Sequence, residues 1–171
     1  IAVHGKLRTI GFGDPKASVS FDAEVDPEET LEAAGMIAEK ILKMRKRPDV
    51  LIIHNPDIGR AAAGLSPVIL SGHAHSIRAE RIGDSVLIVA GMTGAAGARY
   101  IEAEEKPSYS AALITLHVDE DGAFVFDHVD LIRMNQSTGE FVVERKFLPV
   151  PEEEPEEKEA STKKEIQETI K

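Results

Sequence analysis

Residues 67–75 read PVILSGHAH, and this stretch decides the fold. Val68 to Leu70 form a short apolar run that is bounded by proline and glycine, which is typical of a buried strand. His73 and His75 leave the carboxyl end of that strand, where open α/β sheets usually place their binding sites. Most of the functional interpretation depends on these histidines and on one more that lies upstream.

The upstream stretch, residues 49–56, has the same design and reads DVLIIHNP. A second apolar strand ends there on His54. The sequence before it predicts a helix that begins with Asp26 as N-cap and Pro27 at the first helical position, and that is stopped by Pro48. A helix that leads into a fully apolar strand is half of a βαβ unit, so we expect an α/β (α+β) fold with neighbouring strands that end in imidazoles.

Three imidazoles at one sheet edge favour metal binding, because neutral imidazole is a common ligand for zinc, iron, manganese and nickel. In a strand, His73 and His75 would point the same way, whereas in a loop they can diverge enough to serve two metals. The alternative is that His54, His73 and His75 are ordinary core or surface histidines.

The remainder of the chain predicts further strands and a tail. A short Ala-rich helix is expected over residues 60–63. Hairpins are expected over residues 77–90 and 109–132, followed by a last strand over 141–147, and polar and apolar residues alternate over 124–131, so this sheet has one solvated face. Residues 149–171 contain eight Glu and four Lys and predict an acidic, disordered tail after a domain that covers residues 1–148.

Composition excludes several classes of protein. The 171-residue chain has no cysteine, so thiolate metal sites and disulfides are absent. The net charge of −10 argues against a nucleic-acid backbone as the main partner. No apolar run is long enough to span a membrane, so we expect a soluble domain, with its compartment and its attachment to a membrane-anchored longer protein left open.

Ser71-Gly72-His73-Ala74-His75 resembles the Gly-His-x-His motif of calcineurin-like metallophosphoesterases. DVLIIHNP resembles the strand that delivers another metal histidine in that family, and LRTIGFGDP at residues 7–15 resembles a strand and turn before the helix. The resemblance covers residues 1–147. It implies a two-sheet β-sandwich with flanking helices, two divalent metal ions (Mn, Fe, Zn or Ni) and hydrolysis of a phosphate ester substrate.

The resemblance also implies roles for single residues. His54 and His73 would bind one metal ion and His75 would join the other. The chemistry of guanidinium and backbone N–H groups, and not the resemblance, suggests candidates for contacts to the substrate phosphate: Asn55, Arg78, Arg99, Gly94 and Gly97. The alternative is that Arg78 is a solvated strand residue and the glycine-rich loop a plain connector.

The family's Asp-x-His, Gly-Asp and Gly-Asn-His motifs do not occur in this sequence. Because the chain begins at Ile1, we expect it to be the C-terminal portion of the phosphoesterase fold, inactive alone, whose N-terminal half or another chain supplies the other ligands. The alternatives are a non-catalytic binding module and a mono-zinc structural domain derived from that fold.

Overall fold

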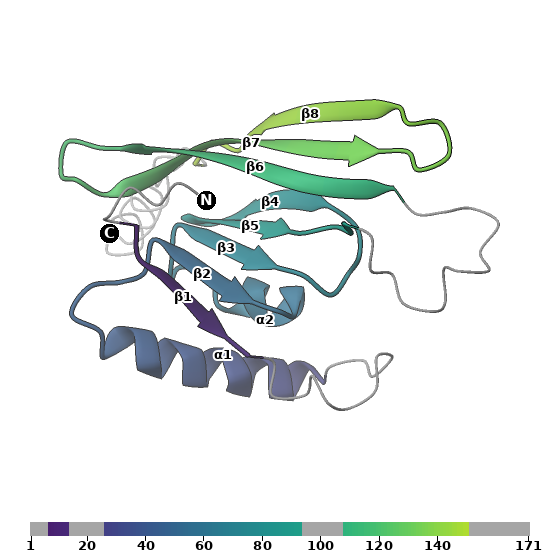
Figure 1. Ribbon diagram of the computed structural model, residues 1–171. Coiled ribbons are helices and arrows are strands. Elements are labelled where there is room, and N and C mark those ends of the chain that lie inside the picture. Colours follow the sequence, from purple (N-terminus) through teal and green to yellow (C-terminus); the bar gives the residue numbers. More distant parts are fainter. Residues whose placement is uncertain (1–6, 14–25, 94–107, 151–171) are drawn as a thin grey trace, which may run out of the picture.

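A computed structural model describes residues 7–13, 26–93 and 108–150 of the chain. These residues form two β-sheets packed face to face, with helices on the outer side of the larger sheet (Figure 1). The mixed α/β sandwich with flanking helices that the sequence predicts is therefore confirmed. The predicted tail, from residue 151 on, and the start of the chain, residues 1–6, lie outside the described residues.

The larger sheet has five strands in the order β1-β2-β3-β5-β4. Its strands are β1 (Thr9–Phe12), β2 (Val50–Ile53), β3 (Val68–Ser71), β4 (Arg78–Ile82) and β5 (Ser85–Val89). β1, β2, β3 and β5 are parallel, and only β4 runs antiparallel to its neighbour β5. The carboxyl ends of β2 and β3 consequently meet at one edge of the sheet.

Two helices, α1 (Pro27–Leu42) and α2 (Pro56–Ala61), cover one face of this sheet (Figure 1). The Asp26 side chain caps α1 by accepting the backbone N–H of Glu28. α1 ends at Leu42, earlier than the predicted stop at Pro48. α2 begins at Pro56, not near residue 60, because Asn55 acts as its N-cap and proline suits the first helical position.

The smaller sheet has the antiparallel order β6-β7-β8, with β6 (Tyr109–Val118), β7 (Phe124–Met134) and β8 (Phe141–Phe147). It packs on the face of the larger sheet that the helices leave free. One core lies between the helices and the larger sheet and includes Ile41, Leu51 and Ile69. The second core lies between the sheets and includes Val68, Val86 and Val129.

None of the helices in the described part of the chain is long and apolar enough to cross a membrane.

Candidate metal centre

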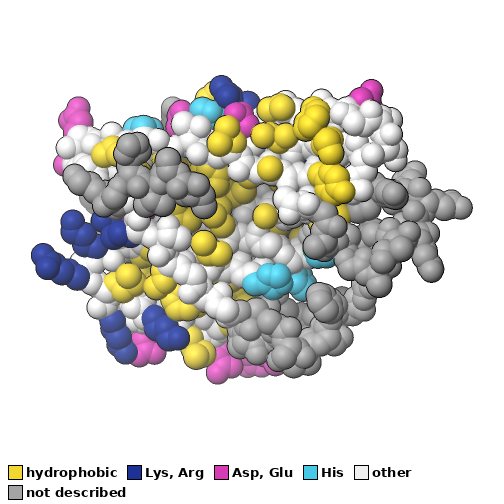
Figure 2. Space-filling model, in the orientation of Figure 1, with side chains coloured by type: hydrophobic (Ala, Val, Ile, Leu, Met, Phe, Trp, Pro, Cys, Tyr) yellow, Lys and Arg dark blue, Asp and Glu magenta, His cyan; other side chains and the backbone are white. Residues whose placement is uncertain are grey.

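His54 and His73 lie at the carboxyl edge of the larger sheet. His54 follows the last residue of β2, and His73 stands two residues after the end of β3. β2 and β3 are parallel neighbours, and the Gly72 backbone N–H donates to the His54 carbonyl at 3.0 Å, which extends the pairing past both strands. Figure 2 shows histidine side chains on the surface of this part of the molecule. The predicted meeting of two strand-end imidazoles is thus realised in the fold.

The two imidazole rings face each other with one nitrogen of each. His73 Nδ1 lies 3.3 Å from His54 Nε2, and the ring centroids are 5.2 Å apart at an interplanar angle of 85°. Two ligands that bind a tetrahedral ion at zinc–nitrogen distances of about 2.0–2.1 Å are themselves separated by about 3.3 Å. The observed spacing therefore fits two nitrogens that share one ion. It equally fits a hydrogen bond in which one ring donates.

The backbone around His73 is strained. His73 has φ 63° and His75 has φ 54°, so two residues with side chains adopt the left-handed region that normally favours glycine. The Ala74 backbone N–H donates to the Gly72 carbonyl at 2.7 Å, which closes a three-residue turn around His73. A γ-turn with positive φ is the rarer and more strained kind. Such strain at a non-glycine residue is commonly retained for function.

His75 does not lie with the other two histidines in one ligand cluster. β3 ends at Ser71, so His73 and His75 belong to the turn that follows it, and the strand alternation that would place them on one face does not apply. Within residues 7–13, 26–93 and 108–150, no group of three or more His, Asp or Glu side chains could hold a metal ion. The structure thus brings two of the three predicted histidines together, and the role of His75 stays a prediction.

Asn55 is buried, at 3% exposure, and its position is explained by the helix that follows. Its side-chain oxygen accepts the backbone N–H of Asp57 at 2.8 Å, and its carbonyl accepts the N–H of Gly59 at 3.0 Å. This capping orients the residue next to His54. Its role toward a phosphate remains a prediction.

Arg78 begins β4 and is half-buried; its Nη1 donates to Ser76 Oγ at 3.4 Å. Gly94, Gly97 and Arg99, the other candidates for phosphate contacts, lie outside the described residues. Gly72 leaves ordinary room at the site, because a Cβ added there would meet His54 Nδ1 at 3.5 Å. This distance is an ordinary van der Waals contact, so a small side chain would also fit at this position.

Sequence reasoning missed an open part of the sheet beside His54. Ile52 alternates with Val50, which packs in the core between the sheets, yet Ile52 is 42% exposed. The three-stranded sheet is narrower than its partner and leaves this position uncovered. The uniform apolar run of β2 carries no signal that would have shown this.

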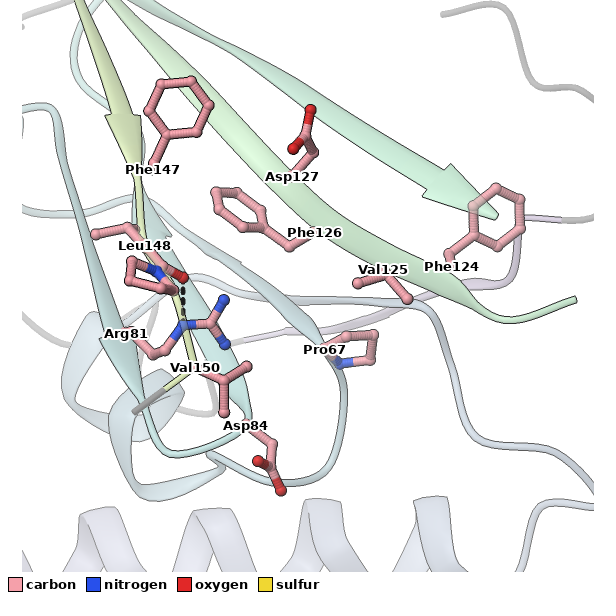
Figure 3. Close-up of a pocket in the computed structure, with 11 residues that line it drawn as sticks. Pro67, Arg81, Asp84, Phe124, Val125, Phe126, Asp127, Phe147, Leu148 and Val150 are labelled. Atoms are coloured by element: carbon pink, nitrogen blue, oxygen red, sulfur yellow. Dashed lines mark hydrogen bonds between the residues drawn. The ribbon is translucent and has the colours of Figure 1, made fainter. Parts of the chain in front are cut away.

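A cavity of about 310 Å³ lies at the edge of the larger sheet opposite to the candidate metal centre (Figure 3). Pro67, just before β3, and Asp84, in the β4–β5 turn, line it together with Phe126 and Phe147. Arg81 Nε donates to the Leu148 carbonyl at 2.5 Å, and burial lowers the pKa of the Arg81 guanidinium. This cavity is separate from the histidines.

Comparison with known proteins gives a distant structural likeness. No protein-family model and no curated protein matches the chain. Among solved structures, the chain is similar to a single mutant of Vps29 from Entamoeba histolytica, with 11% identity, a TM-score of 0.32 and coverage of 82% of this chain and 99% of that chain. Wild-type Vps29 from the same organism, complexed with Zn²⁺, gives 12% identity, a TM-score of 0.32 and coverage of 82% and 97%.

Proposed function

We propose that the chain is the C-terminal part of a calcineurin-like metallophosphoesterase domain and that His54 and His73 bind one divalent metal ion of its site. The observation that carries this proposal is the 3.3 Å separation of His54 Nε2 and His73 Nδ1 at the carboxyl edge of two parallel strands. The Gly-His-x-His pattern at residues 72–75 supports it. The activity is hydrolysis of phosphate esters, which requires the ligands that this sequence lacks.

A bound divalent ion in such a site supplies Lewis-acid charge and an activated water. The residues of this chain hold and orient the ligands. The hydrogen bond between Gly72 and the His54 carbonyl fixes the two turns relative to each other, and the cap at Asn55 fixes the start of α2 directly behind His54. Both imidazoles are exposed, so a metal ion can reach them from solvent.

We also propose roles for His75 and Arg78. His75 would serve a second ion, because it adopts a positive φ in the turn after β3 and, among the described residues, does not join His54 and His73 in one ligand cluster. Arg78 would contact the substrate phosphate, because a guanidinium suits phosphate oxygens and its contact to Ser76 Oγ, at 3.4 Å, is long enough to be exchanged for one to a phosphate.

The experiment is a titration of the 171-residue chain with Zn²⁺ and with Mn²⁺, followed by calorimetry and by the ¹⁵N NMR shifts of the histidine rings. We expect one site, with chemical-shift changes at His54 and His73. His54→Ala and His73→Ala should each lose at least tenfold in metal affinity, because losing even a residue that supports a metal ligand has an effect of this size. His117→Ala is the matched control, because His117 is an exposed histidine on β6, far from this edge. Binding that is unchanged in both ligand variants contradicts the proposal.

A second candidate function, a non-catalytic binding module, is favoured by one observation. The described residues contain no cluster of three or more potential metal ligands. Phosphoesterase assays of the metal-loaded chain, alone and mixed with a separate segment that carries the Asp-x-His, Gly-Asp and Gly-Asn-His motifs, distinguish the two functions. Hydrolysis that is lost in His54→Ala supports the enzyme, whereas metal binding without hydrolysis supports a module or a mono-zinc structural domain.

A further inference from the structure

β8 is an edge strand with an unusually apolar surface. It pairs with β7 on one side, and among the described residues no strand pairs with its other side. Its exposed side chains include Phe141 at 67%, Val143 at 61% and Phe147 at 64%. A long, exposed, apolar edge strand is a template for pairing with another chain.

The middle of β8 carries a charge pattern that is complementary to itself. Glu144, Arg145 and Lys146 follow one another, and Glu144 and Lys146 lie on the same face because they are two residues apart. When two copies of β8 run antiparallel about an axis at Arg145, Glu144 stands opposite Lys146 of the other copy, twice. On the other face, Val143 stands opposite Phe147. Charged residues then meet opposite charges and apolar residues meet apolar residues.

Arg145 would stand opposite Arg145 of the second copy on the axis. The repulsion between these two like charges is offset within each copy. Its Nε and Nη2 bind the two carboxylate oxygens of Asp130 at 2.7 and 2.8 Å. Asp130 lies on β7, directly opposite Arg145, so the pair is neutral within each copy. The two guanidinium groups therefore meet as parts of neutral ion pairs.

Two other registers of the antiparallel pair give less favourable cross-strand contacts. An axis at Glu144 would place this carboxylate opposite its own copy and Val143 opposite Arg145. An axis at Val143 would place Phe141 opposite Arg145. β6, the other edge strand of this sheet, has no acidic residue and only His117 as a basic one, so its sequence offers no complementary charges for pairing with a second copy.

We infer that two copies of this chain associate by antiparallel pairing of their β8 strands about a two-fold axis at Arg145, which gives a continuous six-stranded sheet. This association does not depend on the metal centre, because β8 belongs to the three-stranded sheet, whereas β2 and β3 belong to the five-stranded one. Glu144 would exchange part of its contact with Lys146 of its own chain, a 3.3 Å ion pair, for the Lys146 of the second copy.

Sedimentation velocity over a series of protein concentrations tests the charge pattern. We expect a monomer–dimer equilibrium in the unmodified chain. Lys146→Glu places like charges opposite each other twice and should raise the dimer dissociation constant about tenfold. The exchanged double variant Glu144→Lys with Lys146→Glu restores the opposite charges and should restore the dimer. Lys43→Glu, the same charge change at the exposed C-cap residue of α1, is the matched control.

Cysteine cross-linking tests the register, since the chain has no cysteine of its own. Residues directly opposite each other in an antiparallel pair have Cα atoms about 4.5–5.5 Å apart, which suits a disulfide. An oxidised mixture of Val143→Cys and Phe147→Cys chains should form covalent dimers. Val143→Cys alone should not, because its two copies would be about 13 Å apart.

Several results would overturn the inference. A monomer at every concentration would mean that the three central charges protect the edge from pairing. A dimer that resists charge reversal and gives no cross-link in the mixture would use another surface. A variant that is monomeric because it has unfolded is recognised by circular dichroism, and the cross-linking result then decides.

Discussion

Gly59 brings α2 into close contact with the larger sheet near the histidines. It lies inside α2, and a Cβ added there would meet Ser71 Oγ at 2.7 Å, Leu87 Cδ1 at 3.2 Å and Ile69 Cγ2 at 3.4 Å. Ser71 is the last residue of β3, and its hydroxyl is the one buried side-chain polar atom without a hydrogen-bond partner among the described residues. The substitution Gly59→Ala therefore tests how closely α2 is seated on β3.

The expected magnitude follows from two opposing terms. Alanine gains about 1 kcal/mol over glycine in a helix interior. Overpacking a dense core costs about 1–3 kcal/mol. Because the nearest atom is a hydroxyl fixed at a buried strand end, we expect Gly59→Ala to lower the free energy of unfolding by about 1 kcal/mol net. Gly35→Ala in α1 is the matched control, since nothing lies within 4 Å of the added Cβ, and it should stabilise by about 0.5–1 kcal/mol.

Ser71→Ala completes a double-mutant cycle. It removes both the hydroxyl that Gly59→Ala would strike and a buried polar atom that has no partner, so we expect it to be neutral or stabilising by about 1 kcal/mol. The double variant should recover most of the stability that Gly59→Ala loses. Urea unfolding followed by circular dichroism measures all four proteins. If the two changes in the free energy of unfolding are simply additive, the added methyl group of Gly59→Ala does not clash with the Ser71 hydroxyl, and the reasoning is refuted.

Three further predictions concern other contacts. Asn55→Ala should lower the free energy of unfolding by about 1 kcal/mol in the same urea assay. Asn55→Asp should retain most of the stabilisation that this N-cap side chain provides. Gly91→Ala should be among the most destabilising single changes, since its Cβ would lie 1.8 Å from Ser110 Oγ, and a thermal midpoint that does not fall below that of the unmodified chain would contradict this. The hydrogen bonds from Arg145 hold the pKa of the Asp130 carboxyl below its ordinary value. This pair stabilises the fold above about pH 4, and its contribution is lost as the pH falls through the lowered pKa, so Arg145→Gln should flatten the acid limb of the stability–pH curve.

Much of the fold follows from local patterns. β6 and β7 form the hairpin predicted to begin at residue 109, and β8 agrees with the strand predicted over residues 141–147. Alternation and turn residues specify antiparallel strands locally. The start of α1 is signalled by Asp26 and Pro27. The start of α2 was predicted too late, since Asn55-Pro56 is both a turn signal and a helix cap, and only packing against β3 decides between them.

The candidate site is less fully encoded in local patterns. Its position follows from the parallel pairing of β2 and β3, which the sequence predicts through two apolar runs that end in histidine. The divergence of His75 does not, because it depends on φ angles in a turn that no sequence pattern specifies. The exposure of Ile52 depends on where the second sheet stops, which is a property of packing between distant segments.

The strain at the turn gives the strongest argument that this edge has a function beyond packing. Residues with side chains in the left-handed region cost about 1 kcal/mol or more each, and His73 and His75 both adopt it although glycine would avoid the cost. Core packing does not explain the choice, because both side chains are exposed. A hydrogen bond between His54 and His73 returns only about 1 kcal/mol. A ligand that binds the imidazoles offsets more of this cost, so Zn²⁺ should raise the thermal midpoint of the chain, and the increase should disappear in His73→Gly, which relieves the strain and removes the ligand together.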